Sequence, residues 1–144
     1  PAGDRSLSLA IRSAGFGGTS AAEHLERAGR ELLLIGQIES AEGVAALPDL
    51  LARFPRIDLW FLGSLDLSVS LGHPGQTSEG PVLEALQNTG RTIRAAGAFL
   101  GVYAKDVDEA QVWIGEGATM IAVGSDYAML ASQARAVAQA WRTA

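Results

Sequence analysis

Two acidic residues, Glu39 and Asp66, each follow an apolar run that is typical of a buried strand, at about residues 32–38 and 58–63. Because the carboxyl ends of parallel strands meet at one rim, we expect the two carboxylates to converge there. The amide of Gln37 stands nearby, the chain has no Cys, and no His is near either carboxylate. Oxygen ligands of this kind predict Mg²⁺ or Mn²⁺ rather than Zn²⁺.

A second interpretation gives both acids a purely structural role. Asp and Glu are favoured at the starts of helices, because the free N–H groups and the helix dipole there stabilise a negative charge. Each acid would then cap the helix that follows its strand and would hold no metal. Spacing alone leaves both interpretations open.

Composition limits the size of the fold and the class of partner. The chain has 144 residues, 48% of them hydrophobic, which is enough for one unit, residues 1–144, with a real core. Its 16 acidic and 11 basic residues give a net charge of -5 without a Lys/Arg cluster, so we expect no nucleic-acid partner. The absence of Cys excludes a disulfide framework and a thiolate nucleophile. No apolar stretch approaches the ~20 residues of a membrane span and no signal-peptide pattern is present, so we expect no membrane association and a cytoplasmic location.

Four apolar segments are predicted as strands, and a helical pattern follows each of them. Such a succession predicts a parallel sheet with right-handed crossovers. No Gly-x-Gly-x-x-Gly turn follows a strand, which disfavours a dinucleotide-binding fold. The other common solution is a (β/α)8 barrel of typically ~250 residues, of which four units are half. Half a barrel exposes an apolar inner face and two sheet edges, so something has to complete it. The strands are expected at about residues 32–38, 58–63, 99–103 and 120–123.

Caps, glycines and prolines set the expected bounds of the helices. Ser20 and Glu23 have the spacing of a capping box for a helix that Gly29 ends. Pro48 is expected to interrupt the helix after the first strand and to start a second segment. A functional loop is expected over residues 68–80, followed by a helix from Pro81 to Gly97 that buries Val82, Leu86 and Ile93. The next helix is expected to be capped by Asp106 and Glu109 and to bury Val107, Ala110 and Ile114. A last helix, capped by Asp126, has Leu130, Ala134, Val137 and Trp141 in one row.

Three ordered segments carry a resemblance to a known family: Gln37 to Val44, Phe61 to Gly75, and Ala122 to Asp126, with Pro1 to Arg5 as an opening loop of similar pattern. The chain resembles the HpcH/HpaI aldolase family, the metal-dependent (class II) pyruvate aldolases that include the hydroxy-oxo-heptanedioate aldolases. The match runs along the whole chain but covers only part of the family's barrel. The resemblance therefore implies an α/β fold that is the C-terminal half of a (β/α)8 TIM barrel, with four parallel βα units preceded by a loop and one helix.

The resemblance also implies a site. Glu39 and Asp66 would be the protein ligands of a divalent metal, Mg²⁺ or Mn²⁺ with Co²⁺ as a further choice, and Gln37 would lie beside them. Backbone amides near Ser64 and Leu65 would hold the carboxylate of pyruvate or another 2-oxo acid. The metal would act as a Lewis acid that stabilises an enolate, and this enolate would add to an aldehyde or arise by cleavage of a hydroxy-oxo acid.

Two segments depart from the family's pattern. The family usually has Gly-Pro-Ala-Asp-Leu-Ser where this chain has residues 63–68, and Leu65 is bulkier than Ala beside the implied carboxylate site, which bears on the choice of substrate. The opening loop does not end in Gly. Arg5 in that loop is assigned either a substrate-binding role or a structural ion pair.

The rest of the machinery is implied to lie outside this sequence. In the family, the general base, a His paired with an Asp, and a substrate-binding Arg belong to the other half of the barrel. The chain would then need an N-terminal half-barrel, or a homo-oligomer, to complete it. His24 is expected to face solvent and His73 to serve a structural turn. Trp60, Trp113 and Trp141 are expected to pack, the last of them against another subunit.

Three functions remain open at this stage. The leading one is a carbon–carbon lyase that performs aldol cleavage or addition on a 2-oxo acid and an aldehyde. A non-catalytic or repurposed half-barrel assembly subunit is the second, and the retention of Gln37, Glu39 and Asp66 argues against it. The third is a citrate-lyase-like acyl-CoA lyase, to which the Asp-Leu-Ser-x-Ser-Leu-Gly pattern that begins at Asp66 is less well suited than to an aldolase.

Overall fold

The computed structural model describes residues 6–143, and the chain divides into two units between Leu34 and Ile35. The first unit contains a 3-10 segment, η1 (Arg12–Gly17), and helix α1 (Ala21–Glu31). The predicted capping box is confirmed: Ser20 Oγ accepts from the Glu23 N–H, and the Glu23 carboxylate accepts from the Ser20 N–H at 3.0 Å. The carboxylate of Glu23 accepts hydrogen bonds from the Ser20 N–H and from the Ser20 hydroxyl, and these two bonds, the backbone one first, lower its pKa.

Two predictions for α1 are wrong. Gly29 does not end the helix, which continues to Glu31. A glycine inside a helix costs only about 1 kcal/mol, and the Arg27–Glu31 ion pair at 3.5 Å spans that turn. His24 is half-buried rather than turned fully to solvent, and its Nδ1 is buried without a hydrogen-bond partner in the described part of the chain.

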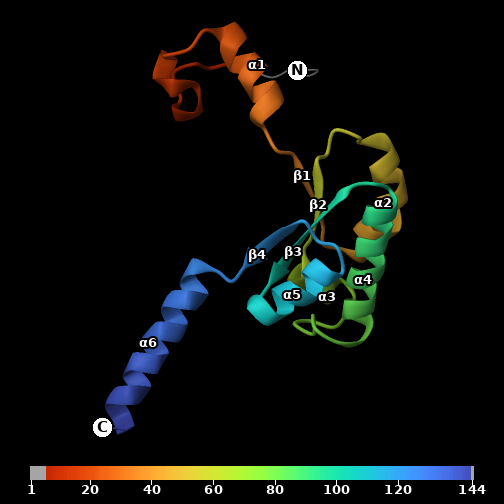
Figure 1. Ribbon diagram of the computed structural model, residues 1–144, viewed down its shortest axis with the longest axis vertical. Coiled ribbons are helices and arrows are strands. Elements are labelled where there is room, and N and C mark those ends of the chain that lie inside the picture. Colours follow the sequence, from red (N-terminus) through yellow and green to blue (C-terminus); the bar gives the residue numbers. More distant parts are fainter. Residues whose placement is uncertain (1–5, 144) are drawn as a thin grey trace. The chain divides into compact units, whose positions relative to one another are not determined.

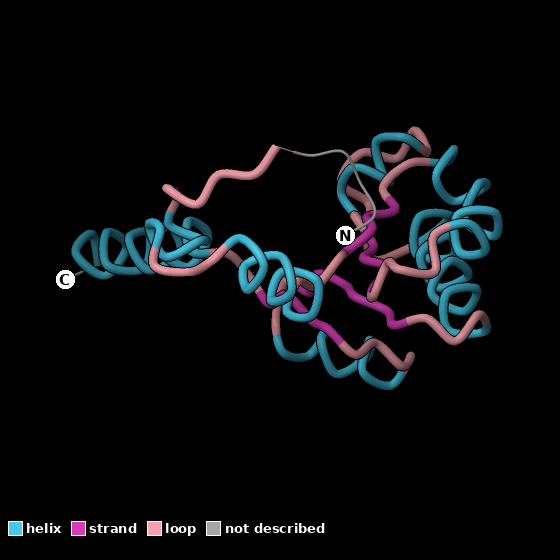
Figure 2. Tube along the Cα trace, turned by 90° about the horizontal axis from the view of Figure 1, so that it is seen from above, coloured by secondary structure: helices cyan, strands magenta, loops and turns pink. Residues whose placement is uncertain are grey.

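The second unit is built on a four-stranded parallel sheet in which the order of the strands follows the order of the chain (Figure 1). The strands can be followed in Figure 2, where they are magenta. Four strand–helix units in succession confirm the sequence prediction. The strands are β1 (Ile35–Ile38), β2 (Leu59–Leu62), β3 (Phe99–Ala104) and β4 (Met120–Val123), and the helices are α2 (Ala41–Arg53), α3 (Ser64–Ser70), α4 (Gly80–Ala95), α5 (Val107–Gly115) and α6 (Asp126–Thr143).

The first strand begins three residues later than predicted. Its first residue, Ile35, pairs with Leu59, the first residue of β2. A turn at Pro55 and Arg56 precedes β2, and the ladder of β1 with β2 begins at this pair. The leucines at residues 32–34 are exposed.

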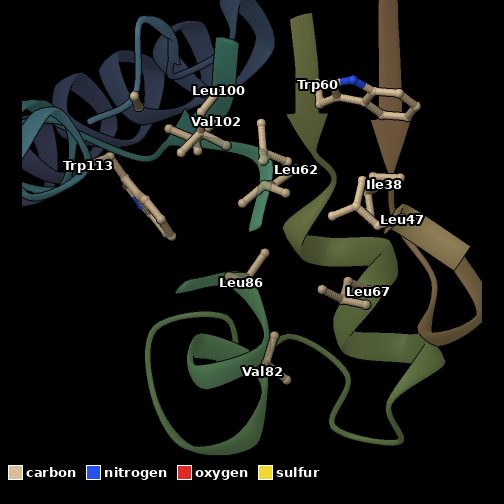
Figure 3. Packing of buried hydrophobic residues seen from close by; sticks show 12 residues of the cluster. Ile38, Leu47, Trp60, Leu62, Leu67, Val82, Leu86, Leu100, Val102 and Trp113 are labelled. Carbon is tan, nitrogen blue, oxygen red and sulfur yellow. The ribbon is translucent and has the colours of Figure 1, made fainter. Parts of the chain in front are cut away.

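One face of the sheet, here called the covered face, packs against helices and forms the core (Figure 3). Ile38, Leu62 and Val102 lie side by side in register on this face, and each is at most 2% exposed. A continuous apolar layer between sheet and helices is what holds an α/β fold together. The helices contribute Leu47 from α2, Leu67 from α3, Val82, Leu86 and Ile93 from α4, and Trp113 from α5.

Helix α2 runs unbroken through Pro48, so the predicted interruption is wrong. Proline lacks an N–H and leaves the carbonyl of Val44 without its usual helical partner. Leu47 is only 1% exposed, and Val44 and Leu51 pack against the same core. This shared apolar face keeps the helix in one piece despite the missing hydrogen bond.

Helix α5 departs from the predicted burial, and the apolar row of α6 is exposed. In α5 the buried residues are Ala110 and Trp113, whereas Val107 and Ile114 are 65% and 51% exposed. The large indole of Trp113 directs the packing face of this short helix. In α6 the predicted apolar row is present in sequence but exposed, since Leu130 is 73% and Trp141 is 81% accessible.

Within the second unit, the opposite face of the sheet, here called the bare face, has no covering layer of helices from residues 35–143. Its exposed residues include Ile35, Phe99, Tyr103 and Met120. Leu59 is an exception, because it is buried beside Gly101 on the neighbouring strand. The exposed apolar inner face expected of half a barrel is thus confirmed. None of the helices in the described chain has the length and apolarity to cross a membrane.

Candidate functional site

Gln37 and Glu39 both project from the bare face at the carboxyl end of β1, because each alternates with the buried Ile38. The Nε2 group of Gln37 donates a hydrogen bond to Oε2 of Glu39 at 2.8 Å. This hydrogen bond orients the carboxylate, and the other oxygen, Oε1, has no partner in the described residues. Gln37 is therefore placed to position Glu39.

Gly63 makes room for this pair. Its N–H donates to the carbonyl of Ile38 at 2.9 Å and continues the β1–β2 ladder by one residue. A Cβ at Gly63 would lie 2.6 Å from Cβ of Glu39 and 2.8 Å from Nε2 of Gln37. It would also lie 3.1 Å from Oε2 of Glu39. Only a residue without a side chain lets the carboxylate lean over the end of β2.

Asp66 lies in the first turn of α3, the short helix that follows β2. A helix at residues 64–70 was not among the elements predicted from the sequence. The residue at the N-cap of α3 is Gly63, which has no side chain to cap it, and the exposed Asp66 makes no hydrogen bond or ion pair in residues 6–143. Helix α2 is capped by Ser40, whose Oγ accepts from the Gly43 N–H at 3.0 Å. Neither Glu39 nor Asp66 is thus used as an N-cap, although Asp66 lies in the first turn of α3, where the helix dipole favours a negative charge.

Both ends of α3 are tied to the segment that carries Glu39. The ladder hydrogen bond of Gly63 holds the start of the helix, and Oγ of Ser70 accepts from the Ala41 N–H at 2.9 Å at its end. The helix therefore places Asp66 after β2, at the same end of the sheet as Glu39 after β1. Sequence reasoning missed this role of Ser70, because a hydrogen bond across 29 positions leaves no periodic signal.

The loop after α3 is closed on one buried hydroxyl. Ser68 is fully buried, and its Oγ donates to the carbonyl of Leu65 at 2.6 Å and accepts from the Gly75 N–H at 2.9 Å. The N–H of His73 donates to the carbonyl of Ser68 at 2.8 Å. The backbone of His73 thus serves a turn, as predicted.

The other predicted substrate-binding residues are Ser64, Leu65 and Arg5. Ser64 and Leu65 begin α3, where no side chain caps the first-turn N–H groups, and the side chain of Leu65 is 62% exposed. Arg5 lies outside the described residues. The described chain contains no cluster of three or more His, Cys, Asp or Glu side chains suited to a metal, so any cation here would rest on two carboxylates.

A pocket in the second unit lies away from the two acids. This open pocket of about 380 Å³ between α4 and α5 is lined by Leu83, Gln87 and Trp113 among others, and neither Glu39 nor Asp66 borders it. The two acids stand on the open side of the sheet instead. A pocket around them requires further structure over the bare face.

Comparison with known proteins identifies the family. Residues 8–133 match the family described as HpcH/HpaI aldolase/citrate lyase. The chain belongs to this family. The resemblance seen in the three sequence segments is therefore confirmed.

Named relatives of the chain are aldolases. It is 34% identical over 121 residues to the hydroxypyruvate/pyruvate aldolase of Roseovarius nubinhibens, covering 84% of this chain and 47% of that protein. It is 31% identical over 142 residues to the 5-keto-4-deoxy-D-glucarate aldolase of Shigella boydii, covering 99% of this chain and 54% of the relative. The chain spans about half the length of the curated relatives it matches.

A solved structure confirms the fold. An HpcH/HpaI aldolase/citrate lyase family protein from Burkholderia cenocepacia J2315 superimposes with a TM-score of 0.85 at 31% identity, over 99% of this chain and 54% of that chain. The four strand–helix units described above are thus half of a (β/α)8 barrel. The bare face of the sheet corresponds to the interior of such a barrel.

Proposed function

We propose that this chain supplies the metal-binding half of a divalent-metal-dependent aldolase. The assembled enzyme would cleave or form a carbon–carbon bond through the enolate of pyruvate or another 2-oxo acid, with an aldehyde as second reactant. Membership in the aldolase/citrate lyase family and relatives named as aldolases support this class of reaction.

One observation carries the proposal. The carboxylate of Glu39 is oriented by Gln37 over the space that Gly63 leaves open, and Asp66 follows the neighbouring strand without serving as a cap. A structural role would leave such acids capping a helix or paired with a cation. Glu39 and Asp66 are neither N-caps nor members of an ion pair within the described residues. They lie at the carboxyl ends of adjacent strands, where barrel enzymes bind their substrates.

The donors fit a small, hard cation. Glu39 and Asp66 offer carboxylate oxygens, and two protein carboxylates leave coordination positions for water and substrate, as Mg²⁺ and Mn²⁺ prefer, with Co²⁺ as a further choice. When bound, such a cation supplies Lewis acidity that stabilises negative charge on the enolate oxygen. Gln37 would act through Glu39, because its hydrogen bond fixes which carboxylate oxygen faces the site.

The start of α3 would hold the 2-oxo acid. The N–H groups of Ser64 and Leu65 lie in the first turn of a helix without a side-chain cap, and such groups, together with the helix dipole, favour an anion. The side chain of Leu65 is 62% exposed there and would narrow the space beside the bound carboxylate. This arrangement favours a small 2-oxo acid.

The remaining groups would come from structure over the bare face. His24 belongs to the first unit, and the backbone of His73 is engaged in the turn at Ser68, so we assign neither as the general base. Four further strand–helix units, carried by another polypeptide or by a longer form of this chain, would close the barrel and supply the base. A second copy of this chain would bring only the same two histidines. Native mass spectrometry paired with denaturing mass analysis identifies which polypeptides are present.

Metal binding by the assembled protein tests the proposal. We expect Glu39→Gln and Asp66→Asn each to weaken Mn²⁺ binding, followed by electron paramagnetic resonance of free Mn²⁺, by at least about 100-fold, because each variant removes one of two charged ligands. Asp49→Asn, an exposed acid on α2, is the matched control and should leave the affinity unchanged. Unaltered Mn²⁺ affinity in both test variants would sink the site assignment.

A further inference from the structure

Tyr103 stands in the same row of the sheet as Glu39. The register pairs Ile38 with Leu62, Leu62 with Val102, and Tyr103 with Ala122. One residue further along the strands, a single row therefore crosses all four of them. In chain order this row consists of Glu39, Gly63, Tyr103 and Ala122.

The side chain of Tyr103 belongs to the bare face. Gly101, two residues earlier on β3, faces the side chains of Leu59 and Phe61 on that face, and residues two apart on a strand share a face. The intervening Val102 is buried in the core on the other side. Tyr103 is 40% exposed, and its hydroxyl makes no hydrogen bond within residues 6–143.

Small residues leave the space between the two side chains open. Neighbouring strands lie about 4.8 Å apart, so the Cα atoms of Glu39 and Tyr103 are separated by about 10 Å with only Gly63 between them. The carboxylate of Glu39 leans over Gly63 from one side. Tyr103 follows Gly63 in the row on the other side, and Ala122 beyond it adds little bulk.

We propose that Tyr103 is a specificity-determining residue that donates its hydroxyl hydrogen to a hydroxyl oxygen of the aldehyde substrate. This inference rests on the proposed function. Glu39 and Asp66 follow β1 and β2, so they place the 2-oxo acid at that side of the rim. The second reactant is left with the side of β3, where Tyr103 offers a neutral donor and an aromatic wall. Short hydroxyaldehydes are therefore favoured over apolar aldehydes of the same length.

Two aldehydes of matched size test this role in the assembled protein loaded with Mn²⁺. Glycolaldehyde carries a hydroxyl group where propionaldehyde carries a methyl group. We expect Tyr103→Phe to lower kcat/KM for glycolaldehyde with pyruvate by about 5- to 10-fold, the effect of one hydrogen bond, and to change the value for propionaldehyde less than about 2-fold. Tyr127→Phe, which alters the other tyrosine of the chain, is the control and should change neither value.

A second measurement separates the failure of this inference from the failure of the proposed function. Exchange of the pyruvate methyl hydrogens with deuterium from D₂O needs no aldehyde, so Tyr103→Phe should leave its rate and the Mn²⁺ affinity unchanged. Equal loss for both aldehydes, no loss for either, or a lost exchange reaction in Tyr103→Phe overturns the role of Tyr103 alone. The absence of exchange in the unsubstituted protein overturns the proposed function and this inference with it.

Discussion

The two faces of the sheet carry similar apolar residues but differ in how far these residues are exposed to solvent. On the covered face Ile38, Leu62 and Val102 are at most 2% exposed, whereas on the bare face Ile35 and Phe99 are 45% and 60% exposed. Strands of a parallel sheet are apolar on both sides because helices or a closed barrel normally cover both. The strands therefore carry apolar residues suited to burial on both faces of the sheet. The helices of the second unit, within residues 35–143, cover only one of these faces. Stability is concentrated on the covered face, and the candidate chemistry lies at the rim of the other.

The largest expected effect is the difference in unfolding free energy between two variants, each of which truncates one aliphatic side chain on one face of the sheet. Leu62→Ala should cost about 2–5 kcal/mol of unfolding free energy, because it opens a cavity in a packed core. Ile35→Ala should cost less than about 1 kcal/mol as long as Ile35 remains 45% exposed. Urea unfolding followed by tryptophan fluorescence measures both, since Trp60 and Trp113 report on the core.

The same pair of variants can break the comparison. Equal losses in Leu62→Ala and Ile35→Ala would show that the bare face is covered in solution. The dependence of the Ile35→Ala loss on protein concentration would then identify an intermolecular cover, because association stabilises the folded state by mass action.

Alanine substitution of two glycines, one on each face of the sheet, gives a second and smaller difference in stability between the faces. A Cβ at Gly36, on the covered face, would lie 2.9 Å from the ring of Trp60, which is only 4% exposed and cannot move aside. We expect Gly36→Ala to cost about 1–3 kcal/mol through overpacking. A Cβ at Gly101, on the bare face, would lie 2.6 Å from side-chain atoms of Leu59 and Phe61.

Of these neighbours Phe61 is half-buried and can move toward open space, whereas Leu59 is only 6% exposed. Gly101→Ala should therefore cost less than Gly36→Ala in the same urea titrations, because only one of its two close neighbours is held in place. A larger loss in Gly101→Ala than in Gly36→Ala would contradict the view that the bare face yields more easily.

Sequence patterns predicted most of the covered face. The stripe of Val82, Leu86 and Ile93 is buried as its spacing indicated, and the four strands lie where apolar runs were found. The topology also placed Glu39 and Asp66 after adjacent strands. These features follow from local periodicity and from the rule that parallel strands end at one rim, both of which can be read from a single sequence.

Features that depend on distant partners could not be predicted in this way. Residues 64–70 alternate polar and apolar side chains, which is typical of a strand, yet they form α3. Ser68 and Ser70 stabilise this helix through hydrogen bonds to the N–H groups of Gly75 and Ala41, which lie outside the segment. Pro48 stays inside α2 because the core beneath Leu47 outweighs one missing hydrogen bond. The contact of Gly63 with Glu39 and Gln37 likewise appears only when two strands are placed side by side.

Loss of a single exposed hydrogen bond tests how the end of α3 supports the rim. Ser70→Ala removes the hydroxyl that accepts from the Ala41 N–H at 2.9 Å, and this exposed hydrogen bond should contribute about 1 kcal/mol. The end of α3 would then be free to move, so Mn²⁺ affinity should fall by about 10-fold although Ser70 does not contact the metal. Ser78→Ala, in the following loop, is the matched control. Equal Mn²⁺ affinity in the two serine variants would mean that the ladder hydrogen bond of Gly63 alone holds Asp66 in place, and that the second anchor of α3 serves only stability.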